Sequence, residues 1–243
     1  MYSEIFSTNG QKISNNNFEN FNLSPAQESD IDFIIEAILE SEKSGTQIIS
    51  TCKVFNISEE EYKNILHEIL KENIEDSEYE LPGYLIAKQD KEYIGTSGSW
   101  IEGLNNISSG LIKSSVLTPY LSKEKINEMN KNLRLISALT LPRENHAFQL
   151  EHIYIREKFR KHGIFSILIK ENIKRNLSRF PFTKVQTILF KDNACSYYAH
   201  LNLGFNEIET KAVQDKAILD FFPYNSKTIL ELNHNKIINL WLN

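Results

Sequence analysis

The stretch from Gln149 to Asn176, QLEHIYIREKFRKHGIFSILIKENIKRN, sets what we expect of the rest of the chain. Its first residues are mostly apolar or aromatic and predict a strand that ends near Ile155. A run of basic residues follows, and Gly163 closes it. Beyond Gly163 the apolar residues repeat at helical spacing: Ile164, Phe165, Leu168, Ile169, Ile173 and Leu177. The stretch is therefore predicted to form a strand, a basic glycine turn and a helix.

The predicted turn has the physical properties of an anion-binding site. The first amides of a helix have no partners inside the helix, and the helix dipole is positive at that end. Gly163 lets the backbone approach a ligand or adopt a positive φ. The side chains of Arg160, Lys161 and His162 can add charge-assisted hydrogen bonds. A pyrophosphate fits such a site, and the alternative is a solvated turn with ordinary basic residues.

A second stretch, Asn193–Phe205, reads NACSYYAHLNLGF and follows one predicted helix and one predicted strand later. Residues 160–165 resemble the acyl-CoA pyrophosphate loop of the GNAT family of N-acetyltransferases, whose pattern is Gln or Arg, two residues, Gly, one residue, then Gly or Ala. The second stretch is similar to the other signature of that family: Asn, a small residue three on, Tyr seven on, then Gly-Phe. The matching residues are Asn193, Ser196, Gly204 and Phe205. There are two departures, since Phe165 replaces a small residue and His200 occupies the Tyr position.

The other predicted elements occur in the order of a GNAT domain. They are a strand at 18–24, a helix over 31–39 capped by Ser29-Asp30, a helix from Ser58 with a capping box at Glu61, a hairpin over 83–101, and strands at 185–190, 205–212 and 228–233. The resemblance implies an α/β fold with a mixed, mostly antiparallel central sheet flanked by helices, and an insertion between strands 3 and 4.

The predicted boundaries are a flexible leader at 1–17, a single GNAT-like acyltransferase domain at 18–234 and a C-terminal tail at 235–243. Residues 102–146 are longer than a plain connection and form the insertion. We expect the insertion to be helical over 122–136 and rich in turns over 105–115. The insertion could shape the acceptor pocket. The alternatives are a peripheral excursion or a dimer contact, and a homodimer is therefore possible.

Composition limits the classes of function. A formal net charge of −5 argues against general nucleic-acid binding. No stretch is apolar for long enough to span a bilayer, and the first residues lack the pattern of a signal peptide, so we expect a cytoplasmic protein. Cys52 and Cys195 lie far apart without metal-ligand spacing, so we expect free thiols and no metal. His200 follows Cys195 by five residues, but nothing in the sequence supplies a third, orienting group for a nucleophile.

The resemblance implies the transfer of an acetyl group from acetyl-CoA to a primary amine. In this family the strand before the loop pairs with the pantetheine arm of CoA where the sheet splays, and the positions here are Ile153, Tyr154 and Ile155. The loop residues from Arg160 to Phe165 would hold the pyrophosphate. Asn193 would cap the following helix and bind an amide of the pantetheine arm.

Glu151 is the predicted general base, acting through a water molecule. Residues 149, 151, 153 and 155 share one face of a regular strand, and bases of the family commonly lie four or six residues before the position of Ile155. Gln149 cannot take a proton, and His152 points to the opposite face of an unbulged strand. The alternative is that Glu151 is a structural carboxylate near the basic loop.

Protonation of the leaving thiolate is assigned to His200, with Tyr197 as the substitute one helical turn earlier. Direct proton transfer from the amine is a third route. A rival interpretation is a non-catalytic protein with a GNAT-like fold that binds acyl-CoA as a sensor or scaffold. The two departures from the signatures, Phe165 and His200, motivate that rival.

Overall fold

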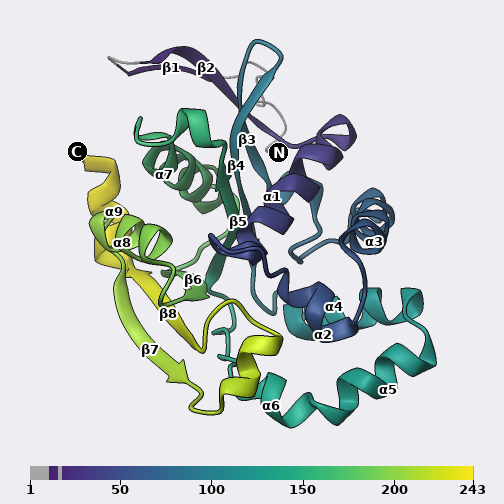
Figure 1. The fold of residues 1–243 in the computed structure, drawn as a ribbon. Helices are drawn as coiled ribbons and strands as arrows, with labels where there is room; N and C mark the ends of the chain where they lie inside the picture. Colours follow the sequence, from purple (N-terminus) through teal and green to yellow (C-terminus); the bar gives the residue numbers. More distant parts are fainter. Residues whose placement is uncertain (1–10, 16–17, 243) are drawn as a thin grey trace.

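The computed structural model describes residues 11–15 and 18–242 of the chain. Its strands are β1 Gln11–Asn15, β2 Phe18–Pro25, β3 Leu85–Gln89, β4 Glu92–Ile101, β5 Phe148–Ile155, β6 Lys184–Phe190, β7 Asn206–Ala212 and β8 Ser226–Asn233. Within the described residues they form one eight-stranded sheet in the order β1-β2-β3-β4-β5-β6-β8-β7 (Figure 1). Each neighbouring pair is antiparallel except β5 and β6, which are parallel. The predicted mixed, mostly antiparallel sheet is confirmed.

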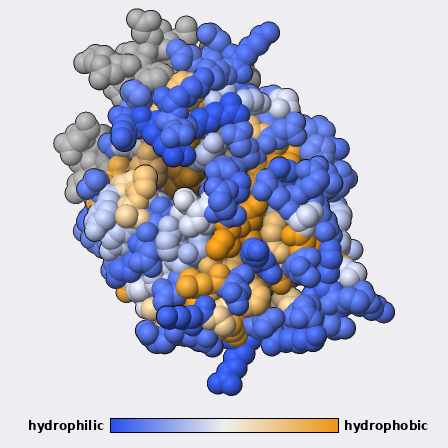
Figure 2. Space-filling model, in the orientation of Figure 1, coloured by the Kyte–Doolittle hydropathy of each residue, from blue (hydrophilic) through white to orange (hydrophobic). Residues whose placement is uncertain are grey.

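Helices cover both faces of the sheet (Figure 1). They are α1 Ile31–Lys43, α2 Ser50–Phe55, α3 Glu59–Glu72, α4 Ser109–Leu117, α5 Lys123–Lys131, α6 Leu133–Ser137, α7 Ile164–Leu177, α8 Ala194–Asn202 and α9 His234–Leu242. Side chains alternate between the faces, as the period of a strand requires. Ile86 of β3 packs in the core with α1 and α3, whereas its neighbours Leu85 and Ala87 pack with the start of α7. Figure 2 shows a recessed band of apolar surface between hydrophilic rims, so part of this interior is open to solvent.

Side-chain capping was predicted at the start of two helices, and the structure shows it for α3 but not for α1. The Oγ of Ser58 accepts a hydrogen bond from the Glu61 amide at 3.0 Å, so the predicted N-cap of α3 is confirmed. Asp30 occupies the N-cap position of α1, but its side chain does not cap the helix. Its carboxylate accepts instead from the amide of Gln27 at 2.9 Å and from the ammonium of Lys88 on β3. The start of α1 is thus tied to the sheet.

The insertion, residues 102–146, packs against the core on the α1 face. Helix α4 begins inside the segment predicted to be rich in turns, and that prediction is wrong from Ser109 onward. The Oγ of Ser108 accepts from the amide of Leu111 at 3.3 Å and caps the helix. Leu117, at the end of α4, is buried with residues of α1 and α3. The helical prediction over 122–136 is confirmed as two short helices, α5 and α6.

The ends of the chain differ from the predicted leader and tail. Residues 11–15 form β1 and pair with β2, whereas residues 1–10 and 16–17 of the predicted leader lie outside the described residues. The predicted tail contains α9, and its Ile237 is fully buried beside β8. Helix α2 was not predicted. None of the helices in the described ranges is long and apolar enough to cross a membrane.

Candidate active site

An opening in the sheet lies between β5 and β6. The two strands pair only at Phe148 with Val185 and at Gln149 with Gln186. On its other side β5 stays paired with β4 as far as Ile155, opposite Gly95. The β6-facing edge of β5 from Leu150 onward therefore has no strand partner among the described residues. An extended ligand with amide groups can pair with such an edge, which is the splay expected from the resemblance.

The basic loop follows β5 directly and lies at the end of this opening where β5 ends. Gly163 is the N-cap of the 14-residue helix α7 and has a φ of 78°, and Lys161 also has a positive φ of 66°. A side chain at Gly163 would be strained in this conformation. Arg160 is exposed, and its Nε donates to the carbonyl oxygen of Ile155 at 2.9 Å. The loop thus brings exposed cations to the N-terminus of a helix, and this donor set fits a pyrophosphate.

The two residues that depart from the family signatures, Phe165 and His200, contact each other. The ring of Phe165, in the first turn of α7, meets the imidazole of His200 on α8 edge to face, with ring centroids 4.9 Å apart. Phe205 packs against the imidazole in the same way at 5.1 Å. Phe165 is partly buried in the core between the helices and β6. The large residue in the loop and the histidine in the second signature therefore form one packing unit.

This packing sets the protonation state of His200, which is 1% exposed. Its Nδ1 lies 2.8 Å from the carbonyl oxygen of Ser196, so Nδ1 carries the proton and donates it. Its Nε2 is buried and has no partner among the described residues. Burial lowers the pKa of His200 to about 4, so the imidazole is neutral at pH 7. A neutral imidazole that already donates its N–H is a poor acid, which counts against the proton-donating role predicted for His200.

Tyr197 is turned toward the edge of the sheet. Its hydroxyl donates to Oε2 of Glu207 on β7 at 2.8 Å, and this hydrogen bond raises the pKa of Tyr197. Strands β8 and β6 separate β7 from the opening. The same helix begins at Asn193, whose Oδ1 accepts from the amide of Ser196 at 3.4 Å. The predicted cap is therefore confirmed, and the contact of Asn193 with the pantetheine arm stays a prediction.

Strand β5 contains a bulge beside the opening. The register steps from Thr96 opposite Tyr154 to Gly98 opposite Glu151, so β5 has one residue more than β4 here. His152 takes up the extra length with a φ of 51°. A Cβ at Gly98 would lie 2.8 Å from the ring of Tyr84, so glycine leaves the space this aromatic residue needs.

Because of the bulge, the predicted arrangement of side chains along β5 is wrong. Ile153 packs with the α7-side core that contains Leu150, so residues 149, 151, 153 and 155 do not share one face. His152 does not point away from Glu151 as in an unbulged strand. Its Nδ1 lies 2.9 Å from the hydroxyl of Tyr84, which belongs to the core on the α1 face. His152 and Glu151 therefore both lie on the α1 face, and burial lowers the pKa of His152.

Glu151 is held by a residue of the insertion. Oε1 of Glu151 forms an ion pair with Arg143, and the two side chains are 17% and 20% exposed. The guanidinium of Arg143 also lies over the ring of Trp100, with 5.3 Å to the centroid. Oε2 of Glu151 has no hydrogen-bond partner among the described residues. The predicted base is thus fixed in position through one oxygen and free to bind water through the other.

Three charged residues that the sequence did not single out extend this cluster. Lys113 of α4 forms an ion pair of 2.6 Å with Glu78, whose side chain is 4% exposed. Burial opposes ionisation of Glu78, but the combined attraction of Lys113 and the other basic residues nearby outweighs it, so the pKa of Glu78 lies below its usual value. The third is Lys227 on β8. Lys227 stands between Ser226 and Thr228 at the polar start of the strand, SKTILELN, so its local sequence gives no signal. Lys113 and Glu78 give none either, because they lie far apart in the sequence.

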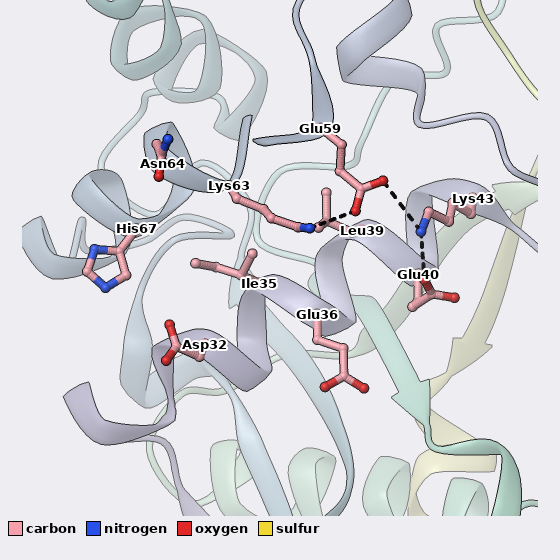
Figure 3. Close-up of a pocket in the computed structure, with 10 residues that line it drawn as sticks. All are labelled: Asp32, Ile35, Glu36, Leu39, Glu40, Lys43, Glu59, Lys63, Asn64 and His67. Atoms are coloured by element: carbon pink, nitrogen blue, oxygen red, sulfur yellow. Dashed lines mark hydrogen bonds and ion pairs between the residues drawn. The ribbon is translucent and has the colours of Figure 1, made fainter. Parts of the chain in front are cut away.

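A groove of about 480 Å³ lies elsewhere, on the solvent side of α1 and α3 (Figure 3). Its charged residues largely satisfy one another: Lys63 pairs with Glu59 at 2.8 Å, and Lys43 pairs with Glu40 at 2.9 Å. We assign it no function.

In the part of the chain that the structure describes, no group of three His, Cys, Asp or Glu side chains could hold a metal ion. Both cysteines are free thiols, as predicted.

Comparisons with known proteins agree with this architecture. No protein-family model matches the chain, and no curated protein matches its sequence. An N-acetyltransferase from Staphylococcus aureus Mu50 has a similar structure, with a TM-score of 0.57 and 13% identity over 86% of this chain and 99% of that one. Arylalkylamine N-acetyltransferase 2 from Aedes aegypti matches with a TM-score of 0.52 and 15% identity over 89% and 100%. YncA from Salmonella typhimurium, whose structure contains acetyl-CoA, matches with a TM-score of 0.50 and 13% identity over 89% and 95%. The chain has the fold of the GNAT N-acetyltransferases.

Proposed function

We propose that the protein transfers an acetyl group from acetyl-CoA to a primary amine. The observation that carries this proposal is the joint presence of an unpaired β5 edge and a basic helix N-terminus at one opening in the sheet. A pantetheine arm needs amide partners along an extended backbone, and a pyrophosphate needs N–H donors and cations. Both sets of groups are present, in the order in which they occur along CoA.

Each part of the opening has a separate role in binding. The edge formed by Ile153, Tyr154 and Ile155 pairs with the pantetheine amides, and Asn193 contacts the same arm. The amides at the start of α7 and the side chains of Arg160, Lys161 and His162 bind the pyrophosphate. Bound acetyl-CoA supplies the thioester. Binding beside a fixed amine site lowers the entropic part of the barrier.

Glu151 removes the proton from the acceptor ammonium through a water molecule. Its place next to the opening and its free Oε2 support this role, and Arg143 holds the carboxylate in one orientation. His152 is the neighbouring candidate on the same face. Its Nδ1 contacts the hydroxyl of Tyr84 and burial lowers its pKa, and we give the base role to Glu151, which has a free carboxylate oxygen.

The leaving thiolate takes its proton directly from the attacking amine in our proposal. His200 is neutral at pH 7 and donates its N–H to Ser196. The hydroxyl of Tyr197 is directed to Glu207, across two strands from the opening. These contacts favour the direct route over either side chain.

The experiment is an incubation of the protein with acetyl-CoA and a panel of primary amines, with free thiol and acetylated amine both measured. We expect amine-dependent thiol release with equal amounts of the two products. Tight binding of acetyl-CoA without thiol release from any amine would favour the rival function, a non-catalytic acyl-CoA sensor or scaffold.

A further inference from the structure

We infer that the acceptor carries a carboxylate as well as its amine, and that Lys227 binds this carboxylate while the amine lies at Glu151. The inference rests on the proposed function and names the class of its acceptor. Lys227 would then be a specificity-determining residue.

Lys227 lies on the same face of the sheet as Glu151. Gln186 of β6 links the strands on this face, because its Oε1 accepts from Gln149 at 3.2 Å and its Nε2 donates to Glu231 at 2.9 Å. Glu231 and Lys227 are four residues apart on β8, whose pairing with β6 has no register shift, so their side chains point to the same face. Gln149 and Glu151 share this face too, because they precede the bulge. The two charged groups therefore lie on opposite sides of the β5–β6 opening.

Lys227 has no anionic partner in the described part of the chain. Its Nζ lies over two aromatic rings, 4.7 Å from the centroid of Phe190 and 4.9 Å from that of Phe222. The other cations of this face are paired, Lys113 with Glu78 and Arg143 with Glu151. The π faces attract the ammonium but carry no net charge, so a half-buried ammonium without a counter-ion still gains from a ligand that supplies negative charge.

The electrostatics of the face agree with this assignment. Burial lowers the pKa of Lys227 to about 8, and the attraction of Glu151 opposes that effect. Lys113 and Arg143 disfavour the charged form of Lys227, whereas Glu42 favours it together with Glu151. Lys227 keeps some exposed surface and is accessible to a small ligand. A lysine across the opening from a fixed carboxylate is complementary to a molecule with one ammonium and one carboxylate.

One lysine favours a carboxylate over a phosphate monoester. A phosphate carries more charge and three acceptor oxygens, and sites for it have several donors. Lys113 and Arg143, the nearest described cations, are already paired, so Lys227 is the one donor that the described residues offer here. Phosphorylated amines therefore serve as a comparison in the test.

The experiment measures kcat/KM by thiol release for matched acceptors that differ only in the carboxylate: phenylalanine and phenethylamine, lysine and cadaverine, and phosphoethanolamine as the phosphate case. We expect the wild type to prefer the carboxylate-bearing member of a pair by about tenfold to a hundredfold. Lys227→Met should remove this preference by raising KM for amino acids, whereas kcat/KM for the plain amines stays unchanged. Lys227→Arg should keep part of the preference, and Lys174→Met on the opposite face should keep all of it.

The outcomes separate this inference from the proposed function. No acetyl transfer to any amine would overturn the proposed function itself. Transfer to amines and amino acids at equal rates in the wild type would overturn the inference alone, and this comparison needs no variant to fold. An unchanged preference in folded Lys227→Met, or a preference for phosphoethanolamine, would also overturn it.

Discussion

The two faces of the sheet acquire their functional residues in different ways. On the α7 side, the loop that we propose for the pyrophosphate is six consecutive residues, Arg160 to Phe165, and one glycine sets its shape. On the α1 side, the charged cluster comes from five separate places in the chain, residues 78, 113, 143, 151 and 227, and depends on a bulge. In our proposal a local motif binds the donor, whereas residues assembled through packing bind the acceptor. The following predictions test this division.

The largest effect is expected from Glu151→Gln, which should lower kcat by roughly two to four orders of magnitude because it removes the base. The affinity for acetyl-CoA, measured by calorimetry, should not change, since Glu151 belongs to the other face. Glu144→Gln is the control, because Glu144 is an exposed carboxylate that pairs with Lys184 at 2.7 Å. Unchanged turnover in Glu151→Gln, with loss of turnover in His152→Gln, would transfer the base role to His152.

Substitutions in the loop at the start of α7 should change the affinity for acetyl-CoA rather than the rate of the chemical step. The double change Arg160→Ala and Lys161→Ala should weaken acetyl-CoA binding by about tenfold to a hundredfold, through loss of charge-assisted contacts. Gly163→Val should do similar damage without changing the charge, because φ is 78° at this residue. Lys158→Ala is the matched control, since Lys158 belongs to the same basic run but pairs with Glu92. Full affinity in the folded double variant would contradict the assignment of the loop.

His200 should control how stability depends on pH. The unfolded chain protonates this imidazole below pH 6.5, whereas the folded protein keeps it neutral down to about pH 4. Unfolding is therefore favoured as pH falls, and His200 should cost about 2 kcal/mol of stability between pH 7 and pH 5. Urea denaturation of His200→Leu should show a smaller loss over this range than the wild type. Equal losses in both proteins would mean that His200 is protonated in the fold.

The smallest effect is expected for the charge of Lys227. Its pKa of about 8 means that the ammonium is lost above pH 8. The inhibition constant of 3-phenylpropanoate, which has the carboxylate of phenylalanine but no amine to titrate, should rise about tenfold between pH 7 and pH 9. Lys227→Met should bind this inhibitor weakly at both pH values. A flat profile in the wild type would show that another group holds the carboxylate.

The sequence predicted most of the fold because its signals are local. The glycine turn, the N-cap at Ser58 and the strand and helix periods each depend on neighbouring residues. The bulge at His152 could not be predicted, because it depends on the register between β4 and β5 and on the space beside Gly98. The pairing of Arg143 with Glu151 depends on how the insertion packs.

The role of His200 shows the same limit. Its position in the second signature was clear from the sequence, but its protonation state follows from the rings of Phe165 and Phe205 around it. Phe165 marked a departure from the family pattern. Its contact with His200 required the fold, since α7 and α8 are separated by a complete strand.

The most direct test of the account is a crystal structure of the protein with CoA. We predict that the pantetheine arm lies between β5 and β6, paired with the backbone of residues 153–155, and that the pyrophosphate contacts the amides at the start of α7. The sulfur should point toward Glu151. A CoA molecule bound outside the β5–β6 opening, or no bound CoA at millimolar concentration, would contradict the central claim.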